Sequence, residues 1–360
     1  MNEHTTDVVI IGGGQSGLSA ARAAQSHGLA AVVLEAGPEP AGSWPHYYDS
    51  LRLFSPAEHS TMPGLPFPGP ADHYPSRDEV AAYLRDYAAE LEADIRCNTT
   101  VTDVTITASG GFRVTTSDGP AWEAGGIIAA SGSFGNPFTP RIPGADTFTG
   151  RSLHSARYRE PAGFEGQRVV VVGAGNSAVQ IGYELAEVAT VTLATRNPIA
   201  FVPQRRDGQD LHYWLHETGF DKLPAQWLAR LVTNTLVVDS GGYRAALEAG
   251  RFDRRPMFTA FHPEGVVWDD GTAEPVDAVI FATGFRPNLR YLESLGALVD
   301  GLPQHEGGLS TTHPGLGYVG LEFQRRFESN TLRGACHDAE YVMQALTPHI
   351  RSAAATVLAG

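Results

Sequence analysis

The sequence predicts an α/β fold made of two Rossmann-like dinucleotide-binding domains, with the second domain inserted into the first. Two observations carry this prediction. A glycine-rich turn between a strand and a helix occurs twice, and two later apolar strands each end in Ser-Gly or Thr-Gly. The length supports it as well, because 360 residues exceed one ordinary hydrophobic core and favour two domains.

The first unit starts at the N-terminus. Val8 to Ile11 form a continuous β-branched run, which is typical of a strand buried on both faces. Gly12, Gly14 and Gly17 follow in the pattern GxGxxG. In this pattern the first glycine makes a tight turn, the second lets a pyrophosphate approach the backbone, and the third lets the helix pack on the strand. The helix N-terminus then offers free N–H groups and a partial positive charge to phosphates.

The second unit repeats this arrangement over residues 167–197. Gly173, Gly175 and Ala178 form the GxGxxA variant, again between a valine-rich strand and a helix. A tight turn without any nucleotide is the alternative interpretation of one such motif. Two copies in the same strand–turn–helix context argue against it.

The two units differ at the position that contacts the ribose. Glu35 ends the second strand of the first unit, and Arg196 stands as many residues after Gly173 as Glu35 stands after Gly12. A carboxylate accepts hydrogen bonds from ribose hydroxyls, whereas an arginine suits a 2′-phosphate that a carboxylate would repel. The sequence therefore predicts FAD at the first unit and NADP at the second.

The two later strands give the domain limits. They end at residues 131–132 and 283–284, and a small residue there avoids a clash with a nucleotide. Prolines between residues 137 and 143 indicate a linker that leaves the first domain. The predicted FAD domain comprises residues 1–158 and 281–360, and the predicted NADP domain comprises residues 159–280.

Composition and charge exclude several functions. The net charge of −14 at pH 7 repels nucleic-acid backbones and anionic lipid. The two cysteines, Cys97 and Cys336, form no CxxC pair, which argues against a disulfide framework, a zinc site and a dithiol redox centre. We find no signal peptide and no run of about 18 apolar residues that would span a membrane. We therefore expect a cytoplasmic protein without nucleic-acid or membrane partners, and homodimer assembly stays open.

A fingerprint lies between the two units. Phe148, Gly150, His154 and Tyr158 match FxGxxxHxxx(Y/F), the pattern of the flavin-containing monooxygenases, which are class B flavoprotein monooxygenases. The related Baeyer–Villiger fingerprint ends in Trp where this chain has Tyr158. The chain resembles this family, in its compact bacterial form, over nearly its whole length.

Two further stretches resemble flavin-binding parts of the family. They are residues 42–68, here called the flavin-side segment, and residues 319–339, here called the C-terminal segment. The resemblance implies that NADPH reduces the flavin, that reduced flavin adds O₂ at C4a, and that the hydroperoxide gives one oxygen atom to a small-molecule substrate. Implied substrates are soft nucleophiles (thioethers and amines) and also ketones in a Baeyer–Villiger reaction. Two alternatives stay open: an NADPH-dependent flavin oxidase or reductase, and a non-catalytic flavoprotein redox sensor.

His154, Tyr158 and Ser55 are the candidates for a part in catalysis. His154 either helps to hold the domains and NADP or is a packed linker histidine bonded to backbone. Ser55 and Pro56 stand where many family members place an asparagine near the flavin C4a, so the resemblance predicts a leaky enzyme that releases H₂O₂.

Further nucleotide contacts follow from the motifs and the resemblance. Trp44 either walls the flavin ring or packs in the core. Asn197 stands where the family often has Thr, so we expect NADPH to be preferred and NADH also to be used. The other predicted contacts are Gln15, Ser16, Gly42, Ser43, His46, Val101, Ser131, Gly132, Asn176, Ser177, Gln180, Thr195, Thr283, Gly284, Asn330, Thr331 and Leu332.

Two regions outside the motifs complete the analysis. Ser76-x-x-Glu79 is a capping box that predicts a helix start. The apolar face of that helix would carry Val80, Leu84, Tyr87 and Leu91. Residues 205–260 contain aromatic helices that form either a lid over the substrate site or a layer packed on the NADP domain. Arg205 and Arg206 there either add to the 2′-phosphate site or line a loop, and we favour the loop.

Overall fold

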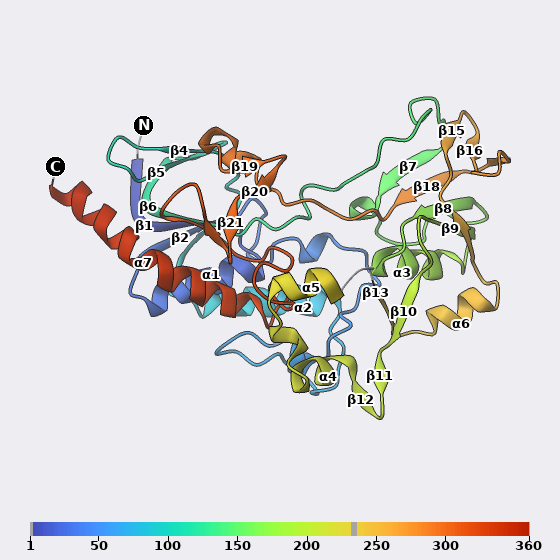
Figure 1. Cartoon of the computed structure of the whole chain (residues 1–360), viewed down its shortest axis with the longest axis horizontal. Helices are drawn as coiled ribbons and strands as arrows, with labels where there is room; N and C mark the ends of the chain where they lie inside the picture. The colour runs from blue at the N-terminus through green and yellow to red at the C-terminus, as the bar shows by residue number, and fades with distance from the viewer. Residues whose placement is uncertain (1–2, 232–235, 360) are drawn as a thin grey trace.

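A mixed sheet of nine strands forms one half of the molecule in the computed structural model, which describes residues 3–231 and 236–359 (Figure 1). Its parallel core has the order β3–β2–β1–β6–β23. The remaining four strands join it in antiparallel pairs. The strands are β1 Glu3–Ile11, β2 Ala31–Leu34, β3 Asp94–Arg96, β4 Val101–Ile106, β5 Phe112–Thr116, β6 Ala121–Ala129, β21 His305–Glu306, β22 Leu309–Ser310 and β23 Leu316–Tyr318.

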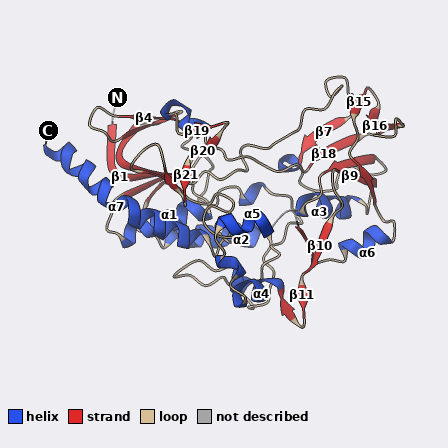
Figure 2. Ribbon diagram, viewed as in Figure 1, coloured by secondary structure: helices blue, strands red, loops and turns tan. Residues whose placement is uncertain are grey.

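Both faces of this sheet are covered, which explains the unbroken apolar run in β1. Val8 and Ile10 pack in a core with the helices α1 (Gln15–Ser26) and α7 (Ala335–Ala359), which Figure 2 shows on one side of the sheet. Val9 and Ile11 point the other way because side chains alternate along a strand. They pack with β4, β5 and the 3₁₀ helix η5 (Arg290–Leu295).

A second sheet of five parallel strands has the order β14–β9–β8–β18–β7 and forms the other half of the molecule (Figure 1). Helices α3 and α6 cover one face and a small three-stranded sheet covers the other. The elements are β7 Arg151–His154, β8 Arg168–Val172, α3 Asn176–Leu185, β9 Thr190–Thr195, α6 Tyr243–Glu248, β14 Asp253–Pro256, β15 Ala260–His262, β16 Gly265–Val267, β17 Ala273–Pro275 and β18 Ala278–Phe281.

The predicted α/β fold with two Rossmann-like units is therefore confirmed. Strand β7 forms its hydrogen bonds with β18 of the second sheet. The second sheet therefore begins within the fingerprint at residues 148–158. The assignment of residues 1–158 and 281–360 to FAD and of residues 159–280 to NADP stays a prediction.

Two antiparallel stretches connect the halves. The main-chain N–H of Phe138 donates to the carbonyl of Gly284 at 3.0 Å, and the N–H of Arg286 donates to the carbonyl of Asn136 at 2.9 Å. The Asn136 side chain adds a bond to the carbonyl of Pro287 at 3.0 Å. The outgoing and returning chains thus brace each other where they cross between the sheets.

The region that the sequence left open divides into two parts. Its helix α6 packs on the second sheet. Residues 204–231, here called the insert segment, pack instead on the flavin-side and C-terminal segments, through bonds such as Gln204 Nε2 to the carbonyl of Phe54 at 2.7 Å. The interpretation that this region forms a layer packed on the NADP unit is therefore wrong for the insert segment. The elements here are β10 Ala200–Pro203, β11 Arg205–Arg206, β12 Gln209–Asp210, α4 Leu211–Glu217, η4 Phe220–Lys222, α5 Ala225–Leu231 and β13 Leu236–Asp239.

The capping box is confirmed at the start of α2 (Arg77–Ala89). The hydroxyl of Ser76 accepts from the N–H of Glu79, and the Glu79 carboxylate accepts from the N–H of Ser76 at 2.7 Å. Val80, Leu84 and Tyr87 of this helix are buried in the first core, and so is Leu91, which was predicted on the helix but lies beyond its end at Ala89. Among the described residues, no helix is long and apolar enough to cross a membrane. The remaining elements are η1 Trp44–His46, η2 Ala57–His59, η3 Ser155–Arg157, β19 Leu298–Val299 and β20 Leu302–Pro303.

Candidate functional site

The first glycine-rich turn has the geometry that its sequence predicts. Gly12 has φ +109°, a left-handed conformation that side chains disfavour. A Cβ added at Gly17 would lie 1.8 Å from the carbonyl oxygen of Gly12, so only glycine lets α1 approach the turn. At Gly14 the nearest described atom would be 3.5 Å away, an ordinary contact. Packing within the protein therefore does not require glycine at position 14, whereas close approach of a ligand does.

Glu35 braces this turn. One carboxylate oxygen accepts from the N–H of Gly13 at 2.5 Å, and the other accepts from the N–H of Gly37 at 2.6 Å. The side chain is buried. Each oxygen keeps a second lone pair, so the carboxylate can still accept a ribose hydroxyl.

The helices that follow the two glycine-rich turns differ from α2 at their N-termini. Gly14 is the N-cap of α1 and Gly175 is the N-cap of α3, and neither helix has a side-chain cap or an acidic residue in its first turn. Helix α2 has both. The first N–H groups of a helix need partners. Those of α1 and α3 are open to an anion, so the residues present fit a nucleotide phosphate at each turn.

Three segments meet at the start of α1. The Gln15 side chain accepts from Trp44 Nε1 at 3.0 Å and donates to the carbonyl of Asn330 at 3.4 Å. It thus links the flavin-side segment to the C-terminal segment. Gly42 lies against Gly14, because a Cβ added at Gly42 would be 2.7 Å from the Cα of Gly14.

The C-terminal segment also approaches Ser16. A Cβ added at Gly320 would lie 2.0 Å from the Ser16 hydroxyl. Leu332 is buried in the first core, and the Thr331 hydroxyl donates to the carbonyl of Glu328 at 2.7 Å. The predicted contacts of this segment therefore lie beside the first turn, with Leu332 held by packing.

Other predicted contacts on the first unit are more scattered. Ser43 caps the short helix η1, and His46 at its end is exposed. Val101 starts β4 and packs on the opposite face of the sheet from α1. The Ser131 hydroxyl donates to the carbonyl of Asn288 at 2.7 Å, and the carbonyl of Gly132 accepts from the N–H of Asn288 at 2.9 Å. Ser131 and Gly132 thus hold the start of the connection between the sheets.

The second glycine-rich turn has the same geometry as the first. Gly173 has φ +142°, and an added Cβ would lie 2.4 Å from the carbonyl oxygen of Ala282. Ala178 is fully buried beside it. The Asn176 amide donates to the carbonyl of Leu236 at 3.2 Å and accepts from the N–H of Val238 at 3.0 Å. Its described partners are therefore the main chain of β13.

Gln180 and Ser177 approach the other half of the molecule. The hydroxyl of Tyr48, in the flavin-side segment, donates to the side-chain oxygen of Gln180, and Ser177 lies within hydrogen-bonding reach of the same tyrosine. Tyr48 is buried, and this burial raises its pKa. No local pattern in the sequence points to Tyr48, because its partner Gln180 lies far away along the chain.

Arg196 lies at the carboxyl end of β9. It is exposed, and no hydrogen bond or ion pair to its guanidinium is found among the described residues. The preceding Thr195 is buried, and its hydroxyl accepts from Arg254 Nε at 2.7 Å. Arg254 comes from the neighbouring strand β14, so two arginines lie near this strand end. Arg205 and Arg206, in contrast, form an exposed hairpin with β12.

His154 joins the fingerprint to the returning chain. Its Nδ1 accepts from the N–H of Ala156 at 3.1 Å, so its Nε2, which lies 3.0 Å from the carbonyl oxygen of Gly284, carries the proton. Burial lowers the pKa of His154. The neighbouring Thr283 hydroxyl donates to the carbonyl of Phe138. The bonds of His154 to the main chain agree with its interpretation as a packed linker histidine. Its position beside Gly284, a predicted NADP contact, agrees with the alternative that it helps to hold NADP.

Tyr158 and Ser55 have described partners within the protein. The Tyr158 hydroxyl donates to Glu184 at 2.9 Å inside the core of the second unit, and burial raises the pKa of this tyrosine. The Ser55 hydroxyl lies 2.9 Å from the Ser60 hydroxyl. Ser55 is partly buried and Ser60 is buried.

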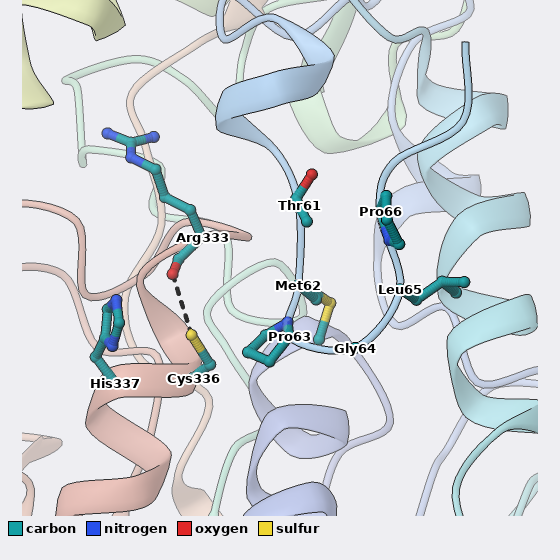
Figure 3. Close-up of a pocket in the computed structure, with 9 residues that line it drawn as sticks. All are labelled: Thr61, Met62, Pro63, Gly64, Leu65, Pro66, Arg333, Cys336 and His337. Atoms are coloured by element: carbon teal, nitrogen blue, oxygen red, sulfur yellow. Dashed lines mark hydrogen bonds between the residues drawn. The ribbon is translucent and has the colours of Figure 1, made fainter. Parts of the chain in front are cut away.

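A surface cavity of about 430 Å³ lies between residues 61–66 and the start of α7 (Figure 3). Its far wall includes Arg333, Cys336 and His337. The Cys336 thiol donates to the carbonyl of Arg333 at 3.2 Å, and burial raises its pKa to about 11. The thiol is therefore protonated at neutral pH. Cys97 and Cys336 are both free cysteines.

Comparisons with known proteins agree with this geometry. Residues 9–228 match the family model described as pyridine nucleotide-disulphide oxidoreductase. The structure of a flavin-containing monooxygenase from Stenotrophomonas maltophilia superposes with a TM-score of 0.84 at 34% identity, covering 96% of this chain and 99% of that one.

Two relatives by sequence cover most of this chain. An indole-3-pyruvate monooxygenase, YUCCA1 of Oryza sativa subsp. japonica, is 30% identical over 81% of this chain and 79% of its own length. An uncharacterized oxidoreductase, CzcO-like, of Geobacillus kaustophilus is 29% identical over 96% of this chain and its whole length.

Proposed function

This chain belongs to the pyridine nucleotide-disulphide oxidoreductase family and, within it, to the flavin-containing monooxygenases, and we propose that it uses NADPH and O₂ to oxygenate small soft nucleophiles. It is an FAD-containing monooxygenase by membership of this group. The observation that carries the proposal is the pair of uncapped helix N-termini at Gly14 and Gly175, one in each sheet unit. Two such sites suit an enzyme that passes electrons between two dinucleotides.

FAD is proposed to bind the first unit. The N-terminus of α1 would hold its pyrophosphate, Glu35 would accept from its ribose, and Trp44 and the C-terminal segment would flank its ring. When bound, the flavin would supply the redox chemistry, with oxygen transfer from a C4a-hydroperoxide to a thioether, an amine or a ketone. The chain itself would orient the ring and exclude water from it.

NADPH is proposed to bind the second unit. The N-terminus of α3 would hold its pyrophosphate and Arg196 its 2′-phosphate. In this arrangement His154 is a positioning residue, because its bond to Gly284 fixes the end of β18 beside the nucleotide. Replacing His154 by Ala would weaken the retention of NADP.

The test is NADPH oxidation with and without a thioether. Purified protein is mixed with NADPH and a thioether such as methyl phenyl sulfide, and sulfoxide is measured by chromatography. Sulfoxide that accumulates with NADPH oxidation supports the proposal. NADPH oxidation that yields only H₂O₂ across sulfides, amines and ketones would establish a flavin oxidase instead, and no oxidation at all would favour a redox sensor.

A further inference from the structure

Three histidines form a row where the insert segment packs on the flavin-side segment. The ring centroid of His212 lies 6.3 Å from that of His59, which in turn lies 6.3 Å from that of His216. The His216 side chain is 59% exposed and the His212 side chain only 5%. His59 is partly buried. The row therefore leads from solvent into the protein.

Asp210 fixes the inner end of the row. Its Oδ1 accepts from the main-chain N–H of His212 at 2.7 Å and from His212 Nδ1 at 2.8 Å. Its Oδ2 accepts from Tyr74 at 2.5 Å and from Gln204 at 2.6 Å. Burial acts to raise the pKa of Asp210, but these hydrogen bonds outweigh it and lower the pKa to about 2. The carboxylate is therefore ionised at neutral pH.

An ionised Asp210 also fixes the tautomer of His212. Because the carboxylate accepts from Nδ1, the proton of the neutral ring is on Nδ1 and Nε2 is an acceptor. Among the described residues, no hydrogen-bond partner of Nε2 is found. The ring stacks on Phe54, with centroids 6.1 Å apart, and Ser55 follows Phe54 in the chain. A carboxylate that orients an imidazole with one free nitrogen is the arrangement that proton transfer needs.

The charged groups around the row are mixed. Glu58 and Asp210 favour the protonated form of His59, whereas Arg333 and His212 oppose it. Glu217 lies 3.4 Å from His216 at the exposed end. Burial lowers the pKa of His59, so the ring is mostly neutral at pH 7 and above and has one unprotonated nitrogen.

Arg205 is a further charge near the inner end. It hydrogen-bonds to Tyr74 and acts on Asp210. The spacing between neighbouring rings admits a bridging water between their nitrogens.

We propose that His216, His59 and His212 form a proton-delivery path from solvent to the flavin-side segment at Phe54 and Ser55, with Asp210 as the positioning residue of His212. The inference rests on the proposed function. Each oxygenation takes NADPH, O₂, substrate and one proton and gives NADP⁺, oxygenated substrate and water. That proton must reach a site from which water is excluded.

The test compares two substitutions of His212. In His212→Asn the amide nitrogen takes the place of Nδ1 and keeps the bond to Asp210, but the acceptor nitrogen is lost. Proton transfer by a positioned side chain typically raises a reaction rate by about 10²–10⁴-fold. Because water can deliver part of the protons in the variant, we expect the rate of sulfoxide formation at pH 8 to fall only about tenfold. FAD content and Tm should stay unchanged, and added imidazole should restore most of the rate. His212→Gln, which lacks the Nδ1 donor, should lose the same rate and also stability.

Two further measurements separate a proton path from a structural role. His27, whose Nε2 lies 2.7 Å from Glu340, is the matched control, and His27→Gln should leave the rate and its pH profile unchanged. Nitrogen NMR of the histidine-labelled holoenzyme should show His212 with a proton on Nδ1 and none on Nε2. Asp210→Asn should shift that tautomer.

The inference is overturned if His212→Asn keeps the full rate and pH profile, if imidazole restores nothing, or if Nε2 carries the proton in the neutral ring. A wild-type enzyme that oxidises NADPH but shows one of these results would leave the proposed function standing. A wild type that never oxidises NADPH would overturn both proposals.

Discussion

Gly14 and Gly175 hold the same place in their units, each as the N-cap of a helix without a side-chain cap. We expect Gly14→Val to abolish FAD binding, because the added side chain would stand where a pyrophosphate meets the helix N-terminus. Flavin absorbance per purified chain measures the effect. Gly175→Val is the matched control and should keep FAD but lose affinity for NADPH. A Gly14→Val protein as yellow as the wild type would contradict the FAD assignment.

Arg196 should decide between NADPH and NADH. A hydrogen bond between an arginine and a phosphate is worth about 1.5–3 kcal/mol, or about 10- to 150-fold in affinity. Arg196→Gln should therefore lower the ratio of kcat/KM for NADPH to that for NADH by a factor in this range. Arg290→Gln, at another exposed arginine, should leave the ratio as it is. An unchanged ratio in Arg196→Gln would refute the assignment.

His154 should make the protein less stable in weak acid. Burial lowers its pKa in the folded state, although the bond to Gly284 acts in the other direction. Between that lowered pKa and the ordinary value of about 6.5, the unfolded chain binds more protons than the folded one. The stability is therefore full above about pH 6.5 and is lost as the pH falls through this window, with a slope of at most about 1.4 kcal/mol per pH unit.

Urea unfolding between pH 7 and pH 5.5 measures this contribution. His154→Gln should show a smaller loss of unfolding free energy over that interval than the wild type, because no imidazole is left to protonate. His313→Gln is the control and should retain the wild-type loss. If His154→Gln retains it too, the acid sensitivity arises at other groups.

At the scale of elements, the short helix η4 is tied to the C-terminal segment by a buried ion pair. Arg333 donates to both carboxylate oxygens of Asp221, at 2.8 and 3.1 Å, and the two side chains are 14% and 2% exposed. Glu328 lies 3.6 Å from the same guanidinium. The insert segment is thereby held over the start of α7.

Asp221→Asn should destabilise the protein by about 3–5 kcal/mol, because it leaves a buried guanidinium with a weaker partner. Urea unfolding of the holoenzyme measures this. The double variant Asp221→Asn with Arg333→Met should be less destabilised than the sum of the single variants, since no uncompensated arginine is left. Strictly additive effects would show that the pair does not act as a unit.

At the scale of the whole molecule, the proposed function implies that electrons from NADPH are divided between oxygenated product and H₂O₂. Ser55, whose hydroxyl lies 2.9 Å from that of Ser60, stands where the family resemblance implies an asparagine. We expect a leaky enzyme, with a sizeable share of NADPH recovered as H₂O₂ even when a thioether is saturating. A coupled peroxidase assay run beside sulfoxide chromatography gives the two shares. Nearly complete coupling would show that another group protects the oxygenating species, and Ser55→Asn should then change little.

Local sequence patterns predicted the features that depend on local geometry. The two glycine-rich turns could be identified because a left-handed turn and a close helix approach leave no choice but glycine at positions 12 and 17. The capping box of α2 was predictable for the same reason, since both of its partners lie within one turn. The family resemblance then covered most of the chain, and the comparisons confirm it.

Contacts between distant segments could not be predicted. The sequence alone determined the two glycine-rich turns, their order and the opposite charges of Glu35 and Arg196 at matching offsets, because each depends on residues close together in the chain. Only the tertiary structure decided that His154 bonds to Gly284, and that the insert segment brings His212, held by Asp210, against Phe54. These pairings join segments that are far apart in the chain, and no period or motif in the sequence encodes which segments meet.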